Sequence, residues 1–186
     1  MAFLDNSNSV KCHWYNYGDG SNSGAGRIVQ VKQTVDTGTS SKTGTTPTQI
    51  GSLAVAITPK SSSHKLLIQV DLKLGSSGAS PEPMIRLLRS VTGGNNDYVY
   101  AGAADGSRST VMFGGDEFHA NNPPWELIQV AGTYLDSAQS ANSHTYRLYW
   151  NRQNTDTLYL NRVHHDNNGA AIPRTASSIT VMEVSA

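Results

Sequence analysis

The chain has 186 residues, of which 37% are hydrophobic and 15% are charged, and its 14 basic residues balance 14 acidic ones. This composition indicates one domain with a hydrophobic core and excludes the charge-rich composition of disordered chains. A net charge of zero gives no electrostatic argument for nucleic-acid binding, because proteins that bind nucleic acid are typically basic.

The single cysteine and the first residues restrict the class of protein further. One cysteine, Cys12, allows neither a disulfide within the chain nor a cysteine-rich zinc site. The start Met1–Asn6 lacks the basic residues and the apolar run of a signal peptide. No stretch approaches the roughly 18–20 apolar residues that span a bilayer. We therefore expect a protein that is made in a cytoplasm and is not inserted into a membrane.

Residues 1–26 differ in composition from the rest of the chain. They are rich in glycine, serine and asparagine, which is typical of flexible linkers and fits a loose tail. They also contain an aromatic cluster with Trp14, Tyr15 and Tyr17, and aromatic side chains dominate docking contacts. We therefore predict that residues 1–26 form an N-terminal attachment arm, anchored on a neighbouring subunit or partner by these three side chains. Residues 27–186 are then the folded domain.

From residue 27 onward, short runs of alternating apolar and polar residues follow one another, with Gly-, Ser-, Asn- and Pro-rich stretches between them. Such alternation is typical of half-buried strands. The predicted strands are Ile28–Val35, Ile50–Ile57, Lys65–Leu74, Pro83–Arg89, Tyr98–Ala101, Thr110–Phe113, Ile128–Leu135, His144–Trp150, Thr157–Asn161 and Ser178–Val184. The stretch from Asp36 to Gln49 is predicted to be a loop.

The strand Lys65–Leu74 has the longest clean alternation, with apolar residues at five alternate positions and mostly polar residues between them. A strand sends alternate side chains to opposite faces, so one face of this segment is dry. We place it at the centre of an antiparallel sheet. About ten short strands and no sustained helical repeat predict an all-β fold. The long, uneven loops favour a two-sheet jelly-roll sandwich over an up-and-down barrel.

The sequence contains no convincing catalytic or metal-binding arrangement. His164, His165 and Asp166 are the most ligand-like cluster, but adjacent strand residues point to opposite faces and seldom share one metal. The carboxylates Glu82, Asp116 and Glu117 lie in Gly- and Pro-rich loops, where acidic residues are usually solvated. We therefore expect a protein that is not an enzyme and that has no catalytic residue, metal or cofactor.

Four tyrosines on predicted strands are candidates for an outward face. Tyr98, Tyr100, Tyr149 and Tyr159 alternate with apolar residues, whereas Tyr146 and Trp150 are predicted to lie in the core. Exposed tyrosines indicate either a subunit interface or a platform for carbohydrate. We favour the interface.

Several segments also resemble a known family. The sequence of residues 27–186 is similar to a jelly-roll domain in virion proteins of marine, cyanophage-like tailed phages, as at the C-termini of tail fibres. The residues that carry the resemblance are Arg27–Thr34, Leu53–Ile68 (LAVAITPKSSSHKLLI), Tyr134–Ser137 (YLDS), Thr145–Tyr146, Leu158–Arg162 (LYLNR) and Ser178–Glu183 (SITVME).

The resemblance implies an exposed virion protein, often a homotrimer of jelly rolls like the heads of tumour necrosis factor or C1q. In tail fibres this domain usually ends a much longer chain, whereas here it is nearly the whole sequence. We therefore expect a small structural protein in the virion, a head decoration or fibre or a short tail appendage, bound to other virion proteins through residues 1–26. The alternative is a receptor-binding tail-fibre tip that recognises host surface glycan. A depolymerase is disfavoured because no acid pair is evident.

Overall fold

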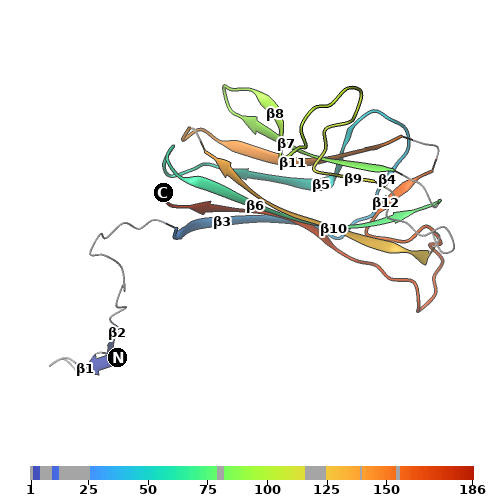
Figure 1. The fold of residues 1–186 in the computed structure, drawn as a ribbon. Helices are drawn as coiled ribbons and strands as arrows, with labels where there is room; N and C mark the ends of the chain where they lie inside the picture. The colour runs from blue at the N-terminus through green and yellow to red at the C-terminus, as the bar shows by residue number, and fades with distance from the viewer. Residues whose placement is uncertain are drawn as a thin grey trace.

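A computed structural model describes residues 26–78, 82–115, 125–138, 140–153 and 156–186, together with the strands β1 (Ala2–Leu4) and β2 (Val10–Cys12). β1 and β2 pair antiparallel with each other. The described part of the domain consists of strands and connections and contains no α-helix. Its strands form two antiparallel sheets that pack face to face, as Figure 1 shows.

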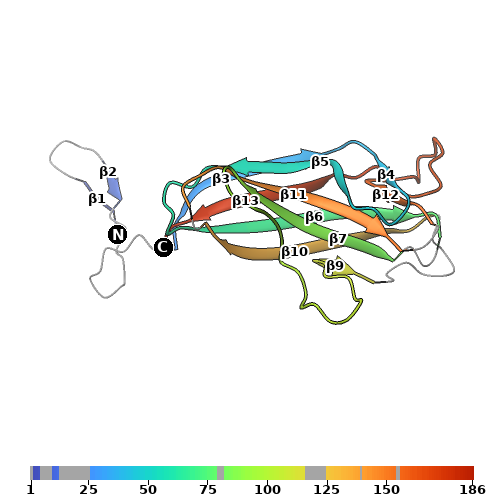
Figure 2. The same cartoon turned by 90° about the horizontal axis from the view of Figure 1, so that it is seen from above.

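One layer is a six-strand sheet built around its longest member. Its strands are β3 (Ile28–Asp36), β4 (Ser41–Lys42), β6 (Lys65–Ser76), β10 (Leu127–Ser137), β12 (Leu158–Leu160) and β13 (Ser177–Val184). β6 pairs with β10 along one edge, and with β13 and then β12 along the other. β3 and β4 form the outer positions beyond β13 and β12. In Figure 2, β3, β13, β6 and β10 run side by side.

The other layer is a five-strand sheet. Its strands are β5 (Thr48–Ile57), β7 (Pro83–Val91), β8 (Asn96–Val99), β9 (Phe113–Gly114) and β11 (His144–Arg152). The order is β5-β11-β7-β8, and β9 pairs with the first residues of β7.

The chain passes repeatedly from one layer to the other. The long strands β3, β6, β10 and β13 lie in the six-strand sheet, while β5, β7 and β11, which fall between them in sequence, lie in the five-strand sheet. The neighbours β3-β13-β6-β10 and β5-β11-β7-β8 give the strand order of a jelly roll. The predicted all-β, two-sheet fold is therefore confirmed.

The core lies between the sheets and is lined by the alternate residues of each strand. On β6 the inward positions are Leu66, Ile68, Val70, Leu72 and Leu74, each at most 4% exposed. These are the residues whose alternation predicted a central strand, and β6 is indeed hydrogen-bonded to neighbours on both sides. The predicted core residues Tyr146 and Trp150 face β6 from β11, and both are fully buried.

Three details differ from the strand predictions. The strand expected at Thr110–Phe113 begins only at Phe113, as β9, because only Phe113 and Gly114 pair with β7. The loop from Asp36 to Gln49 contains the short strand β4, because Ser41 and Lys42 pair with Tyr159 and Leu158 of β12. The strand expected at Tyr98–Ala101 ends one residue after Tyr98, because Tyr100 adopts a φ of 53°, which a regular strand does not allow.

Buried polar groups close the rim where β3 and β13 meet the β5–β6 connection. Glu183 is fully buried and accepts hydrogen bonds from the Gln30 amide, the Lys60 backbone N–H and His64 Nδ1, each at 2.6 Å. Burial disfavours its charge, but these hydrogen bonds outweigh that cost and hold the pKa of the Glu183 carboxyl below its usual value. Glu183 is therefore a charged tie between β13, β3 and the segment before β6.

The close approach of β6 to the segment after β12 gives a test of the packing. A Cβ added at Gly75 would lie 2.3 Å from the Arg162 carbonyl oxygen, whereas at Gly102 it would meet nothing within 4 Å. We expect Gly75→Ala to lower the free energy of unfolding by about 1–3 kcal/mol because the backbone must move apart, and Gly102→Ala to change it little. Urea denaturation followed by tryptophan fluorescence measures both. Equal stability of the two variants would contradict this packing.

Candidate functional site

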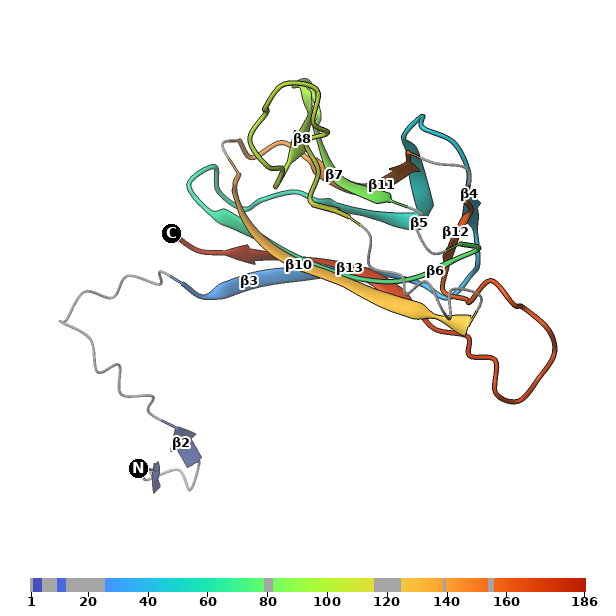
Figure 3. The same ribbon diagram turned by 45° about the vertical axis from the view of Figure 1, so that its right-hand side comes forward.

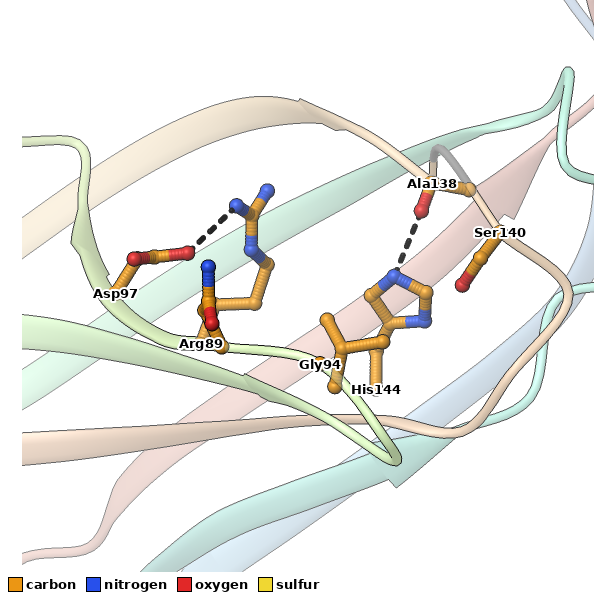
Figure 4. A pocket seen from close by; sticks show the side chains of 8 residues that line it. Arg89, Gly94, Asp97, Ala138, Ser140 and His144 are labelled. Carbon is orange, nitrogen blue, oxygen red and sulfur yellow. Dashed lines mark hydrogen bonds and ion pairs between the residues drawn. The ribbon is translucent and has the colours of Figure 1, made fainter.

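A pocket of about 260 Å³ opens at one end of the sandwich, beside the β7–β8 turn and the β10–β11 connection. Its polar lining comes from three places: Arg89 on β7, Asn95 and Asp97 at the start of β8, and Ser140 and His144 at the start of β11. Figure 4 shows Arg89 and Asp97 on one side of the pocket and His144 with Ala138 and Ser140 on the other.

Arg89 joins the two sheets beneath this pocket. Its Nη1 donates to both carboxylate oxygens of Asp136 on β10, at 2.9 and 3.0 Å, and its Nη2 lies 3.3 Å from Asp97. The Tyr146 hydroxyl donates to the same Asp136 carboxylate at 2.7 Å. Asp136 is almost fully buried, so three strands from both layers converge on one buried charge.

The surroundings of Arg89 and Tyr146 raise the pKa of both side chains. Burial disfavours the charge on Arg89, but the attraction and hydrogen bonds of Asp136 outweigh burial and raise the arginine pKa. Burial, and then the negative charge of Asp136, raise the pKa of Tyr146 far above its usual value. Arg89 therefore stays charged and Tyr146 stays a hydrogen-bond donor. The arrangement is suited to holding the sheets together rather than to transferring protons.

Both ring nitrogens of His144 lie close to backbone carbonyl oxygens in the wall of the pocket. Nδ1 lies 2.8 Å from the Asn142 carbonyl oxygen, and Nε2 lies 2.7 Å from the Ala138 carbonyl oxygen, as Figure 4 shows for the second contact. The imidazole is fully buried. A general base needs a ring nitrogen directed at its substrate, and here both nitrogens are directed at the backbone. His144 thus positions the β10–β11 connection.

The predicted ligand-like cluster does not converge on one point. His164 Nδ1 lies 2.9 Å from the Tyr159 hydroxyl, the His165 ring packs on Trp125 with centroids 4.3 Å apart, and Asp166 pairs with Arg174 at 2.5 Å. These residues belong to the long β12–β13 connection, which extends from the end of the sandwich in Figure 3. Among the described residues, no three His, Cys, Asp or Glu side chains form a group that could hold a metal ion.

The acidic candidates are not brought together either. Glu82 is exposed just before β7, and Asp116 and Glu117 lie outside the described residues. The predicted anchors Trp14, Tyr15 and Tyr17 also lie outside the described residues.

The four candidate tyrosines are divided among three places. Tyr98 and Tyr149 share the outer face of the five-strand sheet, with ring centroids 6.2 Å apart in an edge-to-face arrangement. Tyr100 leaves that face because of its positive φ and stacks on Tyr134 of β10, with centroids 5.3 Å apart. Tyr159 points outward from β12 but is only 8% exposed, because Arg162 lies 3.9 Å over its ring. Tyr159 therefore lies on the outer side of its strand, but Arg162 covers its ring.

A second surface lies on the outer side of the six-strand sheet and was not predicted from the sequence. The strand register places Val31, Met182, Leu67 and Leu135 in one row across β3, β13, β6 and β10. Val31 and Leu135, at the two ends of the row, are each more than half exposed. Ile28 and Val184 extend this row at the end of the sheet where β3 begins. We call these six residues the apolar face.

On β3 the apolar residues of the alternating pattern lie on the outer side of the sheet, and polar residues lie on the inner side. The valine side of this edge strand faces outward, while Gln30 and Thr34 point inward and donate hydrogen bonds to carbonyl oxygens of Thr58 and Ala54. The sequence signal for such a face is the unbroken apolar run Leu66-Leu67-Ile68, which leaves one large apolar side chain on the wrong side of a half-buried strand.

No known family model and no curated protein sequence matches this chain. A separate property concerns membranes: within the described ranges, the structure has no helix of sufficient length and apolarity to cross one.

The buried ion pair between Arg89 and Asp136 gives a testable prediction, and Asp97, the other partner of Arg89, provides the control. Asp136→Asn leaves the Arg89 guanidinium, whose side chain is 16% exposed, without its buried partner, and we expect a loss of about 3 kcal/mol in unfolding free energy. Asp97→Asn removes an exposed partner of the same guanidinium and is expected to cost less than about 1 kcal/mol. Urea denaturation at neutral pH compares the two, and equal losses would show that Asp136 is not the dominant partner.

Proposed function

We propose that this protein is a non-enzymatic structural protein of a phage particle, which assembles through the apolar face. The observation that carries the proposal is the row of four aliphatic side chains across four strands, open at both ends. Contiguous apolar surface of this kind marks interaction sites, because each such side chain contributes about 1.5–3 kcal/mol when it is buried. The resemblance of residues 27–186 to virion jelly-roll domains supports the same role.

The occupant of the apolar face is a second copy of the chain, in a homotrimer. In a cyclic trimer each subunit offers two different parts of its surface to its neighbours. The exposed Val31 on β3 and Leu135 on β10 lie at opposite edges of the six-strand sheet, so one edge of a subunit packs against the other edge of the next. The trimeric architecture itself is taken from the resemblance.

The position of the apolar face also fits attachment by residues 1–26. The chain enters the domain at Gly26, whose N–H donates to the Ser185 carbonyl oxygen at 2.8 Å beside the end of β13. In Figure 1 the start of β3 and the C-terminus lie at the same end of the sandwich. The arm therefore leaves from the end where Ile28 and Val184 extend the apolar face, and it reaches other virion proteins from there.

Within the particle we assign the protein to an exposed place, as a head decoration or fibre or as a short tail appendage. It is made in the host cytoplasm before assembly, and this role needs no cofactor and no nucleic acid. Antibody labelling of intact particles under the electron microscope tests the assignment. Absence of label from purified particles that infect normally would overturn it.

The apolar face predicts the oligomeric state of variants. We expect the wild-type protein to have three times the 19.9 kDa subunit mass in multi-angle light scattering, and Leu135→Lys to reduce this to one subunit by placing a charge in the contact. Leu88→Lys, on the outer face of the other sheet, is the matched control and should leave the trimer intact. A wild-type protein that is a monodisperse monomer, or a trimer lost only in Leu88→Lys, would contradict the assigned face.

Residues 1–26 give a second prediction. Deletion of residues 1–17 removes Trp14, Tyr15 and Tyr17 and should abolish incorporation into particles, while the circular dichroism spectrum and thermal midpoint of the domain stay unchanged. Replacing the three aromatic residues by serine in the full-length chain should have the same effect if they are the anchors. Normal incorporation of the deleted protein would remove the arm from the proposal.

A further inference from the structure

The two sheets carry different charge although the whole chain is neutral. The strands of the six-strand sheet contain four lysines and four acidic residues. The strands of the five-strand sheet contain four arginines and one acidic residue, Asp97, a net charge of +3. Positive charge is therefore concentrated in one layer of the sandwich.

Two of the four arginines lie on the outer side of this sheet. The register pairs Arg86 on β7 with Tyr149 on β11, and Arg147 on β11 with Leu88 on β7, which in turn pairs with Tyr98 on β8. Residues paired across strands point to the same face. We call Arg86, Arg147, Tyr98 and Tyr149 the basic face. The two arginines occupy diagonal positions, about 7–8 Å apart along the sheet surface.

Arg86 and Arg147 differ from Arg89 on the inner side of the sheet, whose charge is neutralised by ion pairs. Arg89, on the inner side, pairs with Asp136 and Asp97. In the described part of the chain, Arg86 and Arg147 form no ion pair, and each donates to a neutral group, the Asn151 side-chain oxygen and the Ser90 hydroxyl respectively. These hydrogen bonds orient the guanidinium groups and leave their positive charge on the surface.

Tyr98 provides an aromatic surface beside these charges. Its side chain is 45% exposed, and the Arg86 guanidinium lies 5.8 Å from its ring centroid. The edge-to-face contact with Tyr149 fixes its orientation on the sheet. An amphipathic ring held on a rigid strand can pack against the apolar face of a sugar ring, while arginine pairs with a carboxylate in a bidentate way.

We propose that the basic face binds an acidic polysaccharide, with a sugar ring on Tyr98 and the carboxylates of neighbouring sugars on Arg86 and Arg147. Nucleic acid is a poorer fit, because its binding depends on many phosphate contacts and this face supplies two cations. A second copy of the same face is also a poorer fit, because two pairs of arginines would repel each other. The proposal does not depend on assembly, since the apolar face belongs to the other sheet.

Affinity electrophoresis and calorimetry in about 0.15 M salt test the proposal, with three carboxylated polysaccharides as probes: polygalacturonate, alginate and hyaluronate. Neutral dextran, dextran sulfate and single-stranded DNA are the comparison polymers. We expect binding to at least one carboxylated probe and none to dextran. If the protein binds none of the three probes, the proposal is overturned. It is also overturned if dextran sulfate and DNA bind as strongly as the carboxylated probes, because that would indicate a nonspecific attraction for polyanions.

Variants locate the binding on the basic face. Arg86→Gln, Arg147→Gln and Tyr98→Ala are each expected to weaken binding about tenfold, which is the scale of one charge-assisted hydrogen bond or one stacking contact. Arg174→Gln, an exposed arginine on the β12–β13 connection, is the matched control and should bind normally. Tyr98→Phe keeps the ring and is expected to bind like wild type even if Tyr98→Ala is unstable. Loss of binding in Arg174→Gln but not in Arg86→Gln would place the ligand elsewhere.

The same measurements on Leu135→Lys separate this proposal from the proposed function. If the variant is monomeric and still binds the probe with an unchanged constant per site, both proposals stand. If the wild type is a monomer that binds a probe, the proposed assembly is contradicted and the proposed binding by the basic face is supported. If the trimer forms but binds none of the probes, the proposed binding by the basic face is contradicted and the proposed assembly is supported.

Discussion

The inner side of β6 is the constraint on which the sandwich depends. Its five aliphatic side chains meet the inner side of β5, β7 and β11, and the strand is hydrogen-bonded along both edges to β10, β13 and β12. A one-residue slip of β6 would turn every one of these side chains outward, so the registers of its three neighbours are fixed together. Both the apolar face and the polar ties at the rim follow from this register.

Buried polar groups complete the closure that the aliphatic core begins. Glu183 ties β13 to β3 and to the segment before β6, and Asp136 ties β10 to β7 and β11. Each carboxylate accepts several hydrogen bonds, which a buried charge requires. The register places Asp136 and Glu183 on either side of Leu66 in one row of the six-strand sheet, so both carboxylates hold the two layers together at the same end of the sandwich.

The outer sides of the two sheets are chemically different, so each suits a different kind of partner. The six-strand sheet presents aliphatic side chains in a row, which suits contact with another copy of a neutral protein. The five-strand sheet presents arginines beside tyrosines, which suits an acidic ligand with flat apolar surfaces. In the proposed assembly, contact through the first surface would leave the second surface uncovered.

The amino-acid sequence by itself determined the positions of the long strands, the central place of β6 and the two-layer class, because a period of two is a local property that a half-buried strand shows. The short strands β4, β8 and β9 were missed or misplaced, because two to four residues are too few to show a period. The sequence also indicated that Tyr98 and Tyr149 point outward. Only the tertiary structure decided which side of β3 is the inside, since an edge strand can bury polar residues against carbonyl oxygens of a neighbour. The tertiary structure also decided that Arg162 covers Tyr159. It alone placed the apolar and basic faces, because each of these faces is a row across strands that are far apart in the chain, and no local pattern specifies the register of those strands.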